Sequence, residues 1–366
     1  MSIVSNQPRY QALDALRGLT IALMILVNTP GSWAYIYAPF QHADWHGCTP
    51  TDLVFPFFLC VVGAAMYFSF RPSGFSWSWP LGVKILRRFA IIFSLGIFLN
   101  AFPFNEPVAQ WRIPGVLQRI ALAYLLAAVV VLSFRRFGII VISLVVLLGY
   151  WLVLWLYGGD QAYGLETNLV RQIDLLVLGE NHLWLGKAIP FDPEGLLSTF
   201  PAVVNVLIGF EIARLITRQH SKTRALITIG VGGVTAILLG LLWNLFMPIN
   251  KSLWTSSFVI YSAGYFALTL ALFIWLIDLR GYRALAQPLI IYGTNPLFIY
   301  VLSILWVKIY YFIPWGEGGN FYEGLFSMLN QWISPLNASL VFAIIHVILF
   351  WFVSVILFKR HIFIKV

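Results

Sequence analysis

Long apolar stretches alternate with short polar connections along most of this chain. Each stretch has roughly the 20 mainly apolar residues that a helix needs to cross the hydrocarbon core of a bilayer. We therefore predict an all-α fold, a polytopic transmembrane helix bundle of about ten spans, as a single domain over residues 1–366. The predicted spans begin near Arg17, Leu53, Ile85, Pro114, Gly138, Gly195, Ala225, Leu253, Ala284 and Ala338.

The composition supports a membrane protein and excludes an ordinary soluble domain. Hydrophobic residues make up 60% of the chain and charged residues 10%, whereas a soluble domain carries about 25% charged residues.

The net charge of +9 would suggest a nucleic-acid partner in a soluble protein. Here most Lys and Arg residues fall on one side of the predicted membrane and most acids on the other. Because Lys and Arg favour cytoplasmic loops, we predict cytoplasmic termini, the lipid bilayer as a partner and no nucleic-acid partner.

Two predicted spans are interrupted by helix-breaking residues. The first contains residues 28–31 (NTPG) and the ninth contains residues 293–296 (GTNP), and proline interrupts a helix because it lacks a backbone donor. The first break is either a kink near the outer end of the span or a site where Asn28 lines a cavity. Since Asn295 lies beside the second break, we expect the two asparagines to share one polar cavity.

The densest group of titratable side chains lies after the first break, with His42, Asp44, His46 and Asp52 in one short segment. Imidazole titrates near neutral pH and can take a proton from a nucleophile. The two histidines would share one face if the segment were helical, but their spacing is weak evidence for a metal, and we predict none. The alternative is a surface loop whose histidines face water. Residues 49–52 (TPTD) also indicate a helix start with an N-cap.

Two arginines stand at the start of the fourth predicted span. Arg112 and Arg119 are seven positions apart and would lie on one face of a helix. Arg119 falls inside the membrane and needs an anionic or carbonyl partner there, and the site is either an internal ion pair or a site for an anionic ligand. Residues 192–195 (DPEG) indicate a helix start before the sixth span, because acids are favoured at a helix N-terminus.

Several of these segments resemble the heparan-α-glucosaminide N-acetyltransferase family, in the same order and over nearly the whole chain. The matching strings are residues 13–18 (LDALRG), Asn28, residues 42–45 (HADW), 51–58 (TDLVFPFF), 112–119 (RIPGVLQR), 178–183 (LGENHL), 192–197 (DPEGLL) and 293–295 (GTN).

The resemblance implies a membrane enzyme that takes an acetyl group from cytosolic acetyl-CoA and places it on the amine of a terminal glucosamine across the membrane. The catalytic histidine of the family falls on His42 and its active-site asparagine on Asn28. Asp52 would orient the imidazole. The bacterial branch implies the inner membrane and a periplasmic glucosamine or glucosamine-terminated saccharide as acceptor. The family also suggests a homodimer.

The donor's charge has a consequence for where it binds. The phosphates of CoA cannot enter hydrocarbon, so the nucleotide is expected at the basic inner face and the acyl arm in a tunnel. The candidate cofactor-binding residues are Arg17, Lys84, Arg88, Arg119 and Asn295.

Two mechanisms and two other functions remain open at this stage. His42 acts either as a general base within a ternary complex or as a carrier of the acetyl group in two steps. A sugar permease or flippase would also use broken spans with polar residues. An O-acyltransferase acting on an envelope polysaccharide would share the donor and the topology.

Overall fold

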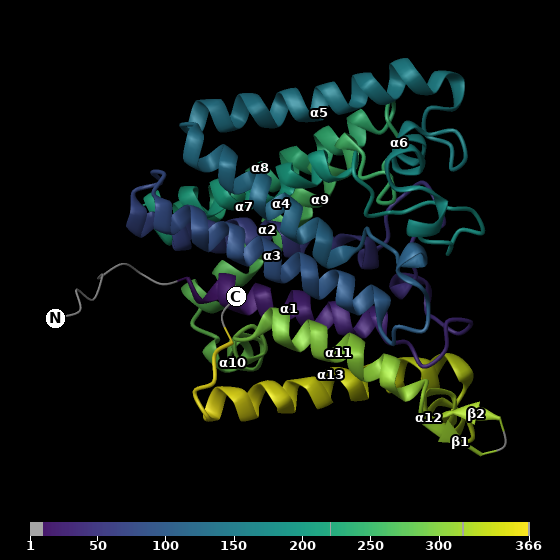
Figure 1. Ribbon diagram of the computed structural model, residues 1–366. Coiled ribbons are helices and arrows are strands. Elements are labelled where there is room, and N and C mark those ends of the chain that lie inside the picture. Colours follow the sequence, from purple (N-terminus) through teal and green to yellow (C-terminus); the bar gives the residue numbers. More distant parts are fainter. Residues whose placement is uncertain (1–9, 220, 317, 365–366) are drawn as a thin grey trace.

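The computed structural model describes residues 10–219, 221–316 and 318–364, apart from the side chains of Asp160 and Leu285. Its long helices lie side by side as one bundle, and both described chain ends are at the same end of it (Figure 1). We call this end the inner end and the opposite end the outer end.

Thirteen helices and one short two-stranded sheet make up the described structure, apart from short 3₁₀ and π turns. The elements are α1 (Gln11–Asn28), α2 (Val54–Phe70), α3 (Trp79–Ala101), α4 (Val116–Ser133), α5 (Arg136–Gly158), α6 (Leu169–Leu178), α7 (Thr199–Arg218), α8 (Lys222–Trp243), α9 (Ser256–Phe273), α10 (Arg283–Tyr292), α11 (Pro296–Tyr310), β1 (Pro314–Trp315), β2 (Gly319–Asn320), α12 (Phe321–Asn330) and α13 (Pro335–Lys359).

The predicted all-α, polytopic class is confirmed. Among the described residues, eight helical segments are long and apolar enough to cross a membrane, and a bent pair makes nine. Helix α3 has 23 residues but carries Lys84, Arg87 and Arg88 near its inner end. Helix α3 is therefore not among the eight or nine candidate spans of the described residues, whereas the sequence predicts ten.

Local sequence explains where many of these helices begin. Ser78, Asn168, Ser221, Thr255 and Asn320 each accept a hydrogen bond from a backbone N–H in the first turn of the helix that follows. Such N-caps satisfy donors that have no partner inside the helix. The helix start predicted at residues 49–52 is also present, as a short 3₁₀ turn (Pro50–Leu53) with a reciprocal capping box.

Both predicted breaks exist, and they differ in kind. Helix α1 ends at Asn28, so the first break terminates a span instead of kinking it. The second break separates α10 from α11, which meet at an angle of 74°. Residue 18 must be glycine for α1 to approach α10, because a Cβ there would lie 1.7 Å from the carbonyl oxygen of Leu289.

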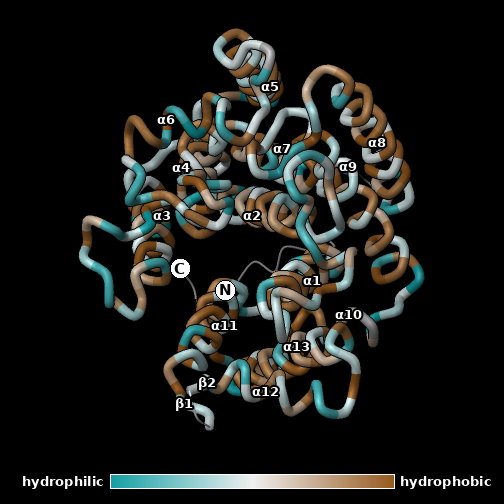
Figure 2. The backbone as a smooth tube through the Cα atoms, turned by 90° about the vertical axis from the view of Figure 1, so that its right-hand side faces the viewer, coloured by the Kyte–Doolittle hydropathy of each residue, from teal (hydrophilic) through white to brown (hydrophobic). Residues whose placement is uncertain are grey.

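The helices form two groups when viewed from the outer end (Figure 2). One group contains α1 and α10 to α13, and the other contains α2 to α9. Helices α2 and α7 form a close pair in the second group, since a Cβ on Gly63 would lie 1.8 Å from the Val206 carbonyl oxygen and one on Gly209 1.9 Å from that of Cys60. Helix α1 ends at the outer end. The loop that follows it (residues 29–53), the loop before α7 (residues 179–198) and the turn before α9 (residues 244–255) lie beside this helix end. The polar segments of the chain therefore meet there.

Candidate active site

A cavity of about 440 Å³ lies at the outer end, where α1 stops. Its polar lining comes from five separate parts of the chain: the end of α1, the loop before α2, the loop before α4, the loop between α6 and α7, and the turn between α8 and α9. The side chains with chemistry on this lining are Asn28, His42, Asp52, Arg112, Lys187, Glu194 and Lys251, and the aromatic ones are Trp33, Trp45, Trp184, Phe55 and Tyr300. The structure therefore brings Asn28, His42 and Asp52 to one cavity.

His42 is held in a defined orientation by Asp52. Its Nδ1 lies 2.7 Å from Asp52 Oδ1, and the side chain of Asp52 is 1% exposed against 47% for that of His42. The other carboxylate oxygen accepts hydrogen bonds from the backbone N–H groups of Ala43 (3.1 Å) and Thr49 (3.0 Å). When Nδ1 donates to Asp52, Nε2 is left as an acceptor on the cavity side.

The segment that carries the two histidines is not helical, so the condition under which His42 and His46 would share one face is not met. His46 instead lies with its Nδ1 3.4 Å from the side-chain nitrogen of Asn250, and burial lowers its pKa. In the described part of the chain, no three His, Cys, Asp or Glu side chains are grouped as metal ligands.

Lys251 completes the group around His42. Its Nζ lies 3.1 Å from His42 Nδ1, 3.5 Å from Nε2 and 3.5 Å from Asp52 Oδ1. The turn that carries it is fixed by Asn250, which is fully buried and accepts a hydrogen bond from the backbone N–H of Leu253. Burial lowers the pKa of Lys251 below its usual 10.5, against the opposing effect of the Asp52 charge. The group is thus a carboxylate, an imidazole and an amine in mutual contact.

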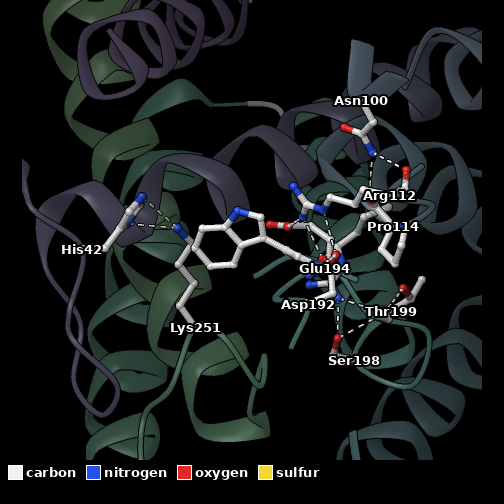
Figure 3. A network of polar contacts seen from close by, with 12 residues as sticks. His42, Asn100, Arg112, Pro114, Asp192, Glu194, Ser198, Thr199 and Lys251 are labelled. Atoms are coloured by element: carbon white, nitrogen blue, oxygen red, sulfur yellow. Dashed lines mark hydrogen bonds and ion pairs between the residues drawn. The ribbon is translucent and has the colours of Figure 1, made fainter. Parts of the chain in front are cut away.

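Arg112 faces this group across the cavity (Figure 3). Its guanidinium donates to both oxygens of Asp192, each at 2.8 Å, and to Glu194 Oε2 at 2.7 Å. Burial works to lower the pKa of Arg112, but the hydrogen bonds and charges of Asp192 and Glu194 raise it above its usual range. This pairing orients Glu194 at the cavity wall.

Two predictions made from the sequence are wrong at this wall of the cavity. Asp192 and Glu194 do not start a helix, since α7 begins only at Thr199 and both acids are engaged by Arg112. Arg112 and Arg119 do not share a helix face either, because α4 begins at Val116, after Arg112.

Arg119 lies inside the bundle, in the first turn of α4. It is fully buried and donates to the carbonyl oxygen of Gly195 at 3.0 Å and to the hydroxyl of Ser198. Its guanidinium also lies over the Trp254 ring, 5.0 Å from the ring centroid. The carbonyl partner expected for it is present, and no described carboxylate forms an ion pair with it. Its contacts fasten the segment before α7 to α4.

A second cavity of about 360 Å³ lies toward the inner end, between α1 and α2. Asp14 and Arg17 line it together with apolar side chains. Arg17 donates to the carbonyl oxygen of Gly293 at 2.7 Å and to Asp14 at 3.1 Å.

The other two basic residues predicted to bind the donor at the inner face contact neighbouring helices. Lys84 donates to the Ser69 hydroxyl on α2 at 3.3 Å, and the Arg88 guanidinium lies over the Tyr124 ring, 4.7 Å from the ring centroid. Of these basic residues, Arg17 is the one that lines the inner cavity.

The polar cavity expected to contain both Asn28 and Asn295 does not form. Asn295 is fully buried, donates to the carbonyl oxygen of Ile362 at 3.0 Å and accepts from the backbone N–H of Ile364 at 2.7 Å. Its neighbour Gly293 packs against the backbone of Asp14 and Gly18, in the first half of α1, whereas Asn28 ends that helix. The two asparagines are therefore at opposite ends of a span.

Comparison with known proteins gives this site a context. A family model described as "Heparan-alpha-glucosaminide N-acetyltransferase, catalytic" matches residues 9–241, which is more than half of the chain. The chain belongs to this family. It is 27% identical over 354 residues to a protein of Mus musculus named heparan-alpha-glucosaminide N-acetyltransferase, covering 81% of this chain and 53% of that protein. The Homo sapiens protein of the same name is 27% identical over 352 residues, covering 80% of this chain and 52% of that protein.

The chain thus spans about half the length of these curated relatives of the N-acetyltransferase family. Sequence analysis missed Lys251 as a member of the site. One signal was available: Lys251 is the one charged residue between Arg224 and Asp278, and it falls on the side of the membrane where Lys and Arg are scarce.

Proposed function

We propose that this chain is a transmembrane acetyltransferase that moves the acetyl group of cytosolic acetyl-CoA to the amine of a periplasmic glucosamine, free or at the end of a saccharide, in a bacterial inner membrane. The observation that carries the proposal is the 2.7 Å contact between His42 Nδ1 and Asp52 Oδ1, at a cavity that Asn28 also lines. The names of the family and of its mouse and human members supply the reaction class.

The arrangement along α1 supports a donor that enters from the inner end. Arg17 lines the inner cavity and Asn28 the outer one, and the rise between them is about 16 Å at about 1.5 Å per residue. An extended pantetheine arm is long enough to cover this distance. The apolar lining of the inner cavity, with a charged edge at Asp14 and Arg17, suits a thin uncharged arm joined to a phosphate-bearing group.

We assign the phosphates to the inner face, near Arg17, Lys84 and Arg88, where the nucleotide stays in contact with water. We leave Arg119 and Asn295 out of the donor site. Arg119 donates to Gly195 and Ser198, and Asn295 is hydrogen-bonded to the segment that follows α13. Acetyl-CoA supplies an activated thioester to the outer cavity.

In the proposed reaction His42 is the general base. The neutral amine attacks the thioester carbonyl carbon, the C–N bond forms and the C–S bond breaks. Nε2 of His42 takes the proton released by the amine and returns it to the departing sulfur. Asp52 holds the Nδ1–H, and the amide of Asn28 donates a hydrogen bond to the developing oxyanion. In the alternative two-step route Nε2 of His42 attacks the thioester itself.

The test is acetyl transfer from acetyl-CoA to glucosamine by purified protein in liposomes. Wild type is compared with His42→Ala and with a control, His361→Ala, whose side chain is exposed at the inner end. We expect product from wild type and from the control, and at least a hundredfold less from His42→Ala. Equal product from all three would overturn the role of His42. Uptake of labelled sugar without donor would replace the transferase with a permease.

A further inference from the structure

Lys251 is itself an amine in the cavity where we place the transfer reaction. Its side chain lines the outer cavity, and its Nζ lies 3.1 Å from Nδ1 and 3.5 Å from Nε2 of His42 (Figure 3). A general base takes the proton of an attacking amine from about hydrogen-bond distance. The Nζ atom therefore lies about where the amine of an acceptor has to be for His42 to act on it.

The turn before α9 holds this amine in place. Asn250 is fully buried, its side chain accepts a hydrogen bond from the backbone N–H of Leu253 at 2.8 Å, and its own backbone N–H donates to the Thr255 hydroxyl at 3.0 Å. Asp52 Oδ1 lies 3.5 Å from Nζ on the other side. An amine that is already positioned needs no binding step, and such positioning makes an intramolecular reaction much faster than the same reaction between free molecules.

The amine of Lys251 is a nucleophile only in its neutral form, and its surroundings favour that form more than water does. Burial lowers the pKa of Lys251 below 10.5, and the charge of Asp52 opposes this effect without cancelling it. At a given pH the neutral fraction is therefore larger than on a lysine exposed to water.

We propose that Lys251 is a self-acetylation site, whose amine takes the acetyl group of acetyl-CoA when no acceptor occupies the outer cavity. The inference rests on the proposed function, because it uses the same donor and the same base. The neutral Nζ attacks the thioester carbonyl carbon, the C–N bond forms and the C–S bond breaks. Nε2 of His42 takes the proton released by the amine and returns it to the departing sulfur, so CoA leaves as the thiol.

Acetylation of Lys251 stops the enzyme. The product is a stable, uncharged amide, so Asp52, whose side chain is 1% exposed, loses the cation that lies 3.5 Å away. We expect the acetylated protein to transfer acetyl groups roughly 10- to 100-fold more slowly. A bound acceptor prevents the modification, because its own amine then lies beside Nε2 of His42. The donor alone thus switches the protein off, and the acceptor keeps it active.

The test is peptide mass spectrometry of purified protein in lipid nanodiscs after incubation with acetyl-CoA. We expect an acetyl group on Lys251 in wild type, at least tenfold less of it with saturating glucosamine, and about a hundredfold less in His42→Ala. Two lysines of the same protein report unspecific acetylation. Lys187 lines the same cavity but donates to the carbonyl oxygen of Asp44, and Lys359 is exposed at the inner end of α13.

Activity after the same incubation gives a second readout. Wild type should lose activity when it is incubated with acetyl-CoA alone and keep it when glucosamine is present from the start. Lys251→Arg should keep its activity in both cases, because a guanidinium supplies the charge but stays protonated and does not attack the thioester.

An unmodified Lys251 in wild type, or equal acetylation of Lys251, Lys187 and Lys359, would overturn the self-acetylation site. Acetylated glucosamine is measured in the same samples and separates this proposal from the proposed function. Acetylated glucosamine with an unmodified Lys251 would leave the transferase in place and remove the self-acetylation site. Acetylation of Lys251 that depends on His42, with no glucosamine acetylated, would keep the self-acetylation site and remove glucosamine as the acceptor.

Discussion

The Nζ atom of Lys251 lies 3.1 Å from Nδ1 of His42, although 209 positions separate the two residues in the sequence. Both side chains also contact Asp52, at 3.5 Å from Lys251 and 2.7 Å from His42. An ammonium group at this position balances the charge of a carboxylate that is almost fully buried. We infer that Lys251 positions Asp52 and His42 for the reaction.

Replacement of Lys251 by Met is expected to lower kcat/KM for acetyl transfer roughly 10- to 100-fold, because it removes one charge-assisted contact. The lowered pKa of Lys251 adds a pH dependence. The ammonium group is lost at a lower pH than on an exposed lysine, so wild-type activity should fall on the alkaline side below pH 10.5. Lys251→Arg should retain activity there, because a guanidinium stays charged. An identical alkaline limb in all three proteins would contradict this assignment.

Asp52→Asn is expected to lower kcat by about 10²–10⁴ with little change in KM. The amide keeps the shape of the carboxylate but donates toward Nδ1, so the imidazole takes the wrong tautomer. Steady-state kinetics with acetyl-CoA and glucosamine measure the effect. Asp44→Asn is the matched control, since Asp44 is an exposed acid in the same loop. A loss within threefold for Asp52→Asn would show that the 2.7 Å contact does not orient a base.

Asp174 on α6 is expected to make the folded protein less stable as the pH rises. Burial raises its pKa from 3.8 to about 7, and its Oδ2 has no hydrogen-bond partner among the described residues. Between these values the folded state keeps a proton that the unfolded chain releases, so the free energy of unfolding falls from about pH 4 to about pH 7. The full effect is on the order of 4 kcal/mol.

The melting temperature in detergent at pH 5 and pH 8 tests this dependence. Wild type and the exposed control Asp44→Asn should melt at a lower temperature at pH 8 than at pH 5. Asp174→Asn should show a smaller difference, because an amide does not titrate. The same difference in all three proteins would place the titrating group elsewhere.

Gly209→Ala is expected to destabilise the bundle. Its Cβ would lie 1.9 Å from the carbonyl oxygen of Cys60, so α2 and α7 would have to separate. Overpacking of this kind costs about 1–3 kcal/mol or more. Gly149→Ala on α5 is the control, since a Cβ there meets nothing within 4 Å. Thermal unfolding of the two variants compares them directly, and equal melting temperatures would mean that the contact between α2 and α7 yields easily.

Arg112→Met is expected to cost about 3–5 kcal/mol, because it leaves a buried carboxylate without its partner. Asp192 is fully buried and Glu194 10% exposed at the side chain. The double variant Arg112→Met/Asp192→Asn should recover part of the lost stability, since the unpaired charge is then gone. No recovery in thermal unfolding would show that the shape of the ion pair, and not its charge, holds the loop before α7.

The sequence by itself determined the features that depend on local patterns. Apolar stretches about as long as a membrane is thick predicted the spans. Helix breakers at residues 28–31 and 293–296 predicted the two interruptions, and Thr49 with Asp52 predicted a capped helix start. Each of these depends on residues within a few positions of one another.

Tertiary structure alone decided how these parts form a site. Lys251 reaches His42, and Arg112 pairs with Asp192 and Glu194, only because the loops at the outer end pack together. Asn295, which resembles Asn28 in its local sequence, lies at the other end of the first span. Local sequence could not foresee this, because the partner of a polar side chain in a helix bundle is set by which helices are neighbours and by the depth at which each one ends.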